Sequence, residues 1–108
     1  MPFHDPQTRP TKDLSPGVRT RTFWGENLMF SLVELDANAV IPTHSHPHEQ
    51  GTYLLSGGFE ATVGSETRWV GPGELFIVPG GVEHSVRVGP EITRLVDVFA
   101  PAREDLKY

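Results

Sequence analysis

The chain has 108 residues, a formal net charge of −5 and no cysteine. A chain of this length suits one domain with its own hydrophobic core. The lack of thiols excludes disulfides, thiolate–zinc sites and cysteine nucleophiles, and the negative charge disfavours nucleic acid as a partner. Any metal must therefore bind through imidazole and oxygen ligands.

No apolar run approaches the roughly 20 residues of a membrane span. Residues 1–13 are polar and contain prolines, which is not the pattern of a signal peptide. We therefore expect a cytoplasmic protein without a membrane partner. The 11 glycines and 10 prolines indicate many turns and favour short strands over helices.

Residues 1–17 contain four prolines and are expected to form an N-terminal arm, either ordered or loose, before a single domain over residues 18–108. The alternation in residues 18–24 and the apolar run of residues 28–35 predict two strands. We expect the first of them to be an exposed edge at which a second copy of the chain could pair.

Short apolar segments then alternate with glycine-rich turns. They predict strands over residues 52–55, 59–63, 67–70, 75–78, 82–88 and 92–99, and one helical turn over 102–106. About eight short strands without a long helix indicate an all-β antiparallel sandwich or barrel. Six aromatic residues are expected to pack inside it, namely Trp24, Phe30, Tyr53, Phe59, Trp69 and Phe76.

Residues 42–50 hold three of the five histidines. On one extended strand, His44 and His46 would point to the same face and could reach one ion. Gln50 and His84 complete the predicted ligand set, which suits a divalent first-row metal such as Fe, Mn, Ni, Zn or Co. The neutral amide of Gln50 leaves such a site one positive charge higher than a carboxylate would, which favours an anionic substrate oxygen. His48 is expected to line the mouth or support a ligand.

The segment 92–99 places Asp97 and Phe99 on one mostly apolar face. A buried carboxylate is costly unless it is paired or functional. Asp97 is therefore either a proton-transfer group or the partner of Arg94 or Arg103 in a structural ion pair. Arg103 either presents its guanidinium to a substrate carboxylate or lies on the surface.

Two spacings resemble the motifs of the cupin family. They are HxHx3Qx6G over residues 44–57 and Gx5PxGx2H over residues 73–84, although Val88 stands where the second motif carries asparagine. The resemblance covers roughly residues 18–100. It implies a single-domain jelly-roll barrel (a double-stranded β-helix), a metal inside one mouth, and usually a homodimer.

A narrower resemblance connects HSHPHEQ at residues 44–50 and DVFAPARED at residues 97–105 with the small KdgF-like cupins of pectin and alginate breakdown. That family implies a metal-dependent, non-redox conversion of 4,5-unsaturated uronates, small acidic substrates, to their linear keto form. Its catalytic pattern carries over onto Asp97, Phe99 and Arg103. An iron-dependent dioxygenase, a metal-dependent cyclase or lyase, and a non-catalytic sugar-binding module remain alternatives.

Overall fold

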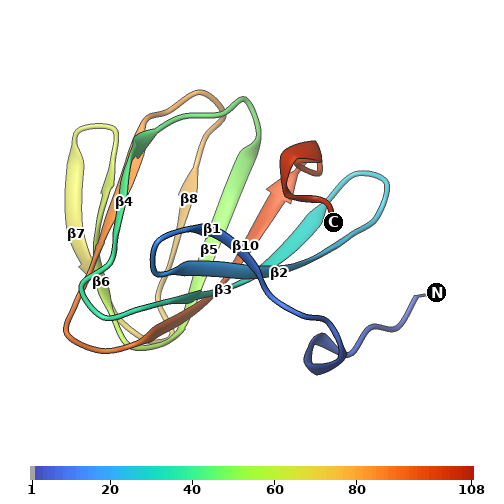
Figure 1. Cartoon of the computed structure of the whole chain (residues 1–108). Coiled ribbons are helices and arrows are strands. Elements are labelled where there is room, and N and C mark those ends of the chain that lie inside the picture. The colour runs from blue at the N-terminus through green and yellow to red at the C-terminus, as the bar shows by residue number, and fades with distance from the viewer. Residues whose placement is uncertain (1) are drawn as a thin grey trace.

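The computed structural model describes residues 2–108 as two packed antiparallel sheets, a jelly-roll arrangement that confirms the predicted all-β class (Figure 1). The large sheet has the strand order β1-β2-β3-β10-β5-β8, and the small sheet has the order β4-β9-β6-β7. The strands are β1 (Lys12–Ser15), β2 (Val18–Trp24), β3 (Met29–Leu35), β4 (Val40–His44), β5 (Glu49–Ser56), β6 (Phe59–Val63), β7 (Glu66–Val70), β8 (Leu75–Val78), β9 (His84–Val88) and β10 (Thr93–Ala100).

The predicted strand boundaries agree with the structure at most positions, and the predicted helical turn is the short 3-10 helix η2 (Glu104–Leu106). The histidine block differs from the expectation. It does not form one strand, because β4 ends at His44 and β5 begins at Glu49. His46 therefore lies in the connection between two strands of different sheets, not on a strand shared with His44.

The N-terminal arm contains a strand that the sequence did not predict. After the 3-10 helix η1 (Pro6–Thr8), β1 pairs with β2 in antiparallel register. The Arg9 guanidinium stacks 4.0 Å above the Tyr108 ring, and the Tyr108 hydroxyl donates to the carbonyl of Pro10 at 2.7 Å. The prediction that β2 is a free edge was therefore wrong for residues 18–20, which pair with β1, while β3 pairs with the other side of β2 along its whole length.

The interior of the sandwich has two chemically different halves. One half, here called the core half, is a cluster of buried apolar side chains that includes Leu35, Leu54, Phe59, Val88 and Leu95. In the other half, here called the site half, the buried side chains include Thr20, Thr22, Ser31, His46, Gln50, Thr52 and His84. Single strands contribute to both halves, because alternate residues of a strand share one face.

The outer faces of the two sheets also differ. On the small sheet the outward residues include Glu60, Thr62, Thr67, Ser85 and Arg87. On the large sheet the four strands β3, β10, β5 and β8 present a surface that we call the apolar outer face, formed by Phe30, Leu32, Gly51, Tyr53, Leu55, Leu75, Ile77, Val96 and Val98.

The prediction that six aromatic residues pack inside the sandwich was wrong for four of them. Phe59 is fully buried and Phe76 packs against the core, but Trp24, Phe30, Tyr53 and Trp69 are exposed. Phe30 and Tyr53 alternate with inward-facing neighbours, so strand geometry places them on the apolar outer face.

Candidate metal centre

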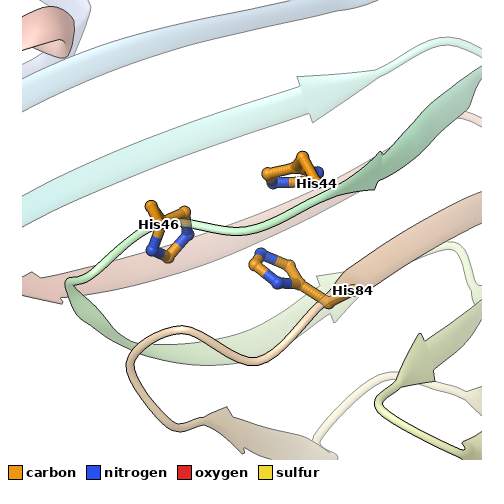
Figure 2. Close-up of side chains that lie close together, drawn as sticks. All are labelled: His44, His46 and His84. Carbon is orange, nitrogen blue, oxygen red and sulfur yellow. The ribbon is translucent and has the colours of Figure 1, made fainter.

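Three histidines converge in the site half, each from a different segment (Figure 2). His44 ends β4, His46 lies in the following connection, and His84 begins β9, which pairs with β4 so that His44 and His84 are register partners. One ring nitrogen from each lies within 4.8 Å of those of the other two. That spacing permits three imidazoles to share one ion.

A backbone carbonyl fixes the tautomer of each of these rings. The Nδ1 atoms of His44, His46 and His84 lie 2.9, 3.0 and 2.9 Å from the carbonyl oxygens of Pro42, His48 and Val82, respectively. A neutral imidazole that donates its Nδ1–H carries a lone pair on Nε2. Burial lowers the pKa of His46 and of His84, which favours the neutral ring. All three Nε2 atoms are thus available as metal ligands.

Gln50 adds an oxygen to this set. Its Oε1 lies 3.0 Å from Nε2 of His46, and its Nε2 donates to Oγ1 of Thr52 at 3.0 Å. With Nδ1 of His46 acting as the donor, a carbonyl oxygen and an imidazole lone pair face each other. A cation bound by both atoms would remove the repulsion between these two acceptors.

The Nε2 atom of His84 is buried and has no hydrogen-bond partner among residues 2–108. A buried nitrogen lone pair without a donor is costly. The four donor atoms, three imidazole nitrogens and one amide oxygen, therefore fit a divalent transition metal. The structure brings His44, His46 and His84 together, with Gln50 beside His46. The ligand set and the identity of the metal both stay predictions.

The glycine turn before His84 packs against the connection that carries His46. The Gly81 N–H donates to the carbonyl of His46 at 2.8 Å. A Cβ at Gly80 would lie 2.4 Å from the carbonyl oxygen of Pro47, so only glycine permits this approach. This close approach of two backbone segments holds the turn before His84 against the connection that carries His46.

Asp97 is joined to the centre through hydrogen bonds. Its Oδ1 accepts from Oγ1 of Thr52 at 2.5 Å and from Nε2 of Gln50 at 3.3 Å. Burial raises the pKa of Asp97 to about 6, against the lowering effect of those two donors. Neither alternative ion pair is present among residues 2–108, because Arg94 pairs with Glu34 and Arg103 pairs with Asp105.

Phe99 and Arg103 lie beside the same centre. The Phe99 ring packs edge-on against His46, with 5.7 Å between ring centroids, and the Arg103 guanidinium lies 5.0 Å from the Phe99 centroid. His48 lies outside the cluster of ligand nitrogens but supports it, since its carbonyl accepts from His46. All the predicted site residues thus lie in one region, and their roles stay predictions.

A cavity of about 510 Å³ connects these residues with the surface. His44, Gln50, His84, Asp97, Phe99 and Arg103 line it. The other lining residues include Thr52 and Lys12, whose place at the site sequence reasoning missed. Thr52 could have been found from period-two spacing after Gln50, whereas Lys12 reaches the cavity only because β1 folds back onto β2.

Lys12 is the register partner of the buried Thr20, which places its side chain on the inner face of the large sheet. Its ammonium lies 5.8 Å from the centroid of the Tyr108 ring. Within residues 2–108 it forms no ion pair. Lys12 is therefore a free cation at the cavity wall.

Within residues 2–108, none of the helices has the length and apolar character needed to cross a membrane. The expected cytoplasmic location stays a prediction.

Comparison with known proteins agrees with the fold and the motifs. The family model "Cupin domain" matches residues 31–99. The pectin degradation protein KdgF of Dickeya dadantii is 30% identical over 105 residues, covering 95% of this chain and 94% of that protein.

Two solved structures are also similar to this chain. The structure of KdgF from Halomonas sp. has a TM-score of 0.92 and 28% sequence identity, and covers 97% of both chains. An RmlC-like cupin from Shewanella frigidimarina has a TM-score of 0.93 and 28% identity, over 99% of this chain and 96% of that one. With a family model matched over more than half of its length, the chain belongs to the cupin family.

Proposed function

We propose that this cupin converts 4,5-unsaturated monouronates to their linear keto form in a metal-dependent isomerisation without redox change. The similarity to KdgF, a pectin degradation protein by name, supports the substrate class. The observation that carries the proposal is Asp97, a buried carboxylate hydrogen-bonded to Gln50 and facing the same cavity as the histidine cluster.

A divalent metal held by His44, His46, Gln50 and His84 would supply a Lewis acid that polarises a substrate oxygen. The residues of the chain fix that centre in advance. Backbone carbonyls orient the three imidazoles, and Thr52 and Asp97 orient the amide of Gln50 so that its oxygen points toward His46. Such orientation by neighbouring groups strengthens metal ligation.

Asp97 is the proposed proton-transfer group. Both of its hydrogen bonds reach Oδ1, which leaves Oδ2 to carry the proton. A pKa of about 6 lets this carboxyl both hold and release a proton near neutral pH.

The reaction balances without an oxidant. The ring C–O bond at the hemiacetal carbon breaks, and the proton of the hemiacetal hydroxyl passes to the former ring oxygen, so that an aldehyde and an enol form. Oδ2 of Asp97 then delivers a proton to the double-bond carbon that carries no oxygen, and the proton of the enol O–H returns to the Asp97 carboxylate. The product is a ketone with the composition of the substrate.

Two cations are available for the substrate carboxylate. The Nε and Nη2 atoms of Arg103 are engaged by Asp105 at 3.3 and 2.8 Å, which leaves the Nη1 side of the guanidinium for an anion. Lys12 lies on the same cavity without an ion partner among residues 2–108. We propose that both bind the carboxylate, and that Phe99 holds the Arg103 guanidinium in place by stacking.

The experiment follows the ultraviolet absorbance of 4,5-unsaturated galacturonate, or of its alginate counterpart, with metal-loaded protein. The conjugated double bond should disappear faster than it does spontaneously, without oxygen uptake, and His46→Ala should be inactive. Oxygen consumption with substrate would favour the iron-dependent dioxygenase instead. No acceleration by folded, metal-loaded protein would remove the uronate assignment.

A further inference from the structure

A row of polar side chains crosses the inner face of the large sheet at Asp97. Thr22 on β2 is the register partner of Ser31 on β3. Asp97 on β10 is in turn the partner of Ser31 on one side and of Thr52 on β5 on the other. Cross-strand partners lie about 5 Å apart, so Asp97 stands between two hydroxyl-bearing side chains. On β3 itself, Ser31 is the one inward-facing residue that is not apolar.

The polar row is confined to the site half. Two residues further along each strand, the next row toward the core half is apolar and consists of Val33, Leu95 and Leu54. A face packed inside a sandwich is normally apolar throughout. The hydroxyl groups beside Asp97 therefore need an explanation other than packing.

The two side chains that flank Asp97 differ in their hydrogen bonds. The Thr52 hydroxyl accepts from Nε2 of Gln50 and donates to Oδ1 of Asp97, so its proton is used. The Ser31 hydroxyl has one bond, with 2.6 Å between its Oγ and Oγ1 of Thr20. Within residues 2–108, Oδ2 of Asp97 has no hydrogen bond. The unused hydrogen-bonding capacity of this row therefore belongs to Ser31 and to Oδ2 of Asp97.

The pair formed by Ser31 and Thr20 holds one spare donor. Two hydroxyl groups carry two protons, and the bond between them uses one. The second proton has no acceptor in the part of the chain that the structure describes. Both side chains are buried, Thr20 at 0% and Ser31 at 1% exposed, where an unmade hydrogen bond is costly. Of the two, Ser31 lines the cavity. The spare donor is satisfied when Thr20 donates to Ser31 and Ser31 donates to a ligand in the cavity.

We propose that Ser31 is a substrate-binding residue, whose hydroxyl donates a hydrogen bond to a substrate hydroxyl beside Asp97. The inference rests on the proposed function and adds a contact to it. In that reaction Asp97 delivers a proton to the double-bond carbon that carries no oxygen. The neighbouring ring carbon, at position 3 of the uronate, carries a hydroxyl group. Because Ser31 and Asp97 are cross-strand neighbours, a hydrogen bond from Ser31 to that hydroxyl holds the reacting carbon near Oδ2.

This contact makes the site selective for ligands that carry the hydroxyl. A site built to bond a hydroxyl group binds an analogue without it more weakly, because its own polar group then stays unpaired. The buried Ser31 hydroxyl has no other acceptor among residues 2–108 to turn to. One neutral hydrogen bond corresponds to an affinity ratio of about ten.

Calorimetric titration of Ni²⁺-loaded protein with galacturonate and with 3-deoxygalacturonate tests the contact. Wild-type protein should bind the deoxy ligand about tenfold more weakly. Ser31→Ala should bind both ligands equally, with the weaker affinity. The control Thr93→Val also removes a buried hydroxyl from the large sheet, but at the far end of β10, where it accepts from the Gly58 N–H at 3.0 Å. This control should keep the wild-type preference.

Three results would overturn the inference: no binding of galacturonate to wild-type protein, equal affinity of wild-type protein for the two ligands, or a Ser31→Ala protein that still discriminates between them. Denaturant unfolding and metal content check each variant. If Ser31→Ala does not fold, Ser31→Cys replaces the hydroxyl with a weak donor of similar size and should lose the preference in the same way. Turnover of the same proteins separates the two proposals. Discrimination without turnover supports the contact and removes the reaction, whereas turnover without discrimination keeps the reaction and removes the contact.

Discussion

The core half and the site half of the interior are built from the same strands, yet the core half is apolar, whereas the site half combines buried polar side chains with a smaller apolar cluster of Met29, Phe99, Ala102 and Leu106. β5 carries Gln50 and Thr52 into the site half and Leu54 into the core half, and β10 carries Asp97 and Leu95 in the same way. Leu54 and Leu95 are register partners, as are Thr52 and Asp97. Two residues along a strand therefore separate the apolar core from the polar site.

The two halves of this small sandwich therefore have different roles. The core half stabilises the fold through burial of apolar surface, whereas the site half keeps buried polar and titratable groups that favour chemistry over stability. Substitutions in the core half should change the free energy of unfolding, and substitutions in the site half should change activity.

The largest effect is expected for Asp97→Asn. Loss of the proton-transfer group should lower kcat by a hundredfold or more, while the amide oxygen of the new side chain can still accept the hydrogen bond from Thr52. Metal content, measured by elemental analysis, should be unchanged. Full activity of this variant would show that Asp97 carries no proton.

Leu54→Ala should lower stability and leave the metal site intact. Leu54 is fully buried in the core half, so its truncation should lower the free energy of unfolding by about 3 kcal/mol. The folded fraction should bind metal with the wild-type stoichiometry. Denaturant unfolding checks the first point, and a lost metal site in folded protein would mean that the two halves are not separable.

The pH dependence of the free energy of unfolding should show that the buried Asp97 carboxylate destabilises the folded protein. In metal-free protein the pKa of Asp97 is raised to about 6, so the folded state binds a proton more tightly than the unfolded state does. Between pH 4 and 6 this group should therefore lower stability as the pH rises, by about 2 kcal/mol in total. Asp97→Asn should remove that fall, and identical pH profiles for the two proteins would contradict the assignment.

The smallest effect is expected for Lys12→Met, which keeps the length of the side chain and removes its charge. Loss of one carboxylate contact should raise KM about tenfold with little change in kcat, since the contact forms in the ground state as well. Equilibrium binding of galacturonate should weaken, and binding of neutral galactose should not. Equal weakening for both sugars would indicate a merely structural role.

The predicted site residues lie close together in the structure, because the motifs constrain their spacing along the chain, and their roles stay predictions. The i, i+2 spacing of His44 and His46 and the glycine turn before His84 hold in the structure, although His46 lies in a connection. Thr52 was missed because threonine is ordinary in a strand. Its period-two spacing from Gln50 indicates the shared face, and the β5–β10 register pairs it with Asp97.

Features that depend on distant segments could not be predicted. β1 forms because contacts with Tyr108, near the other end of the chain, hold the N-terminal arm against the sheet. The same contacts bring Lys12 to the cavity. The run of residues 28–35 was correctly predicted as a strand, but a strand that is apolar on both faces does not reveal whether its outer face is covered by the same chain. That is why Phe30 was expected inside.

The most direct test of this account is calorimetric titration of metal-free protein with Ni²⁺ or Mn²⁺, for the wild type and for His84→Ala. The convergence of one ring nitrogen from each of three histidines, with the amide oxygen of Gln50 beside them, predicts one ion per chain, and binding at least a hundredfold weaker in the variant. Wild-type protein that binds no ion, or a variant that binds it equally well, would contradict the metal centre on which the proposed function rests.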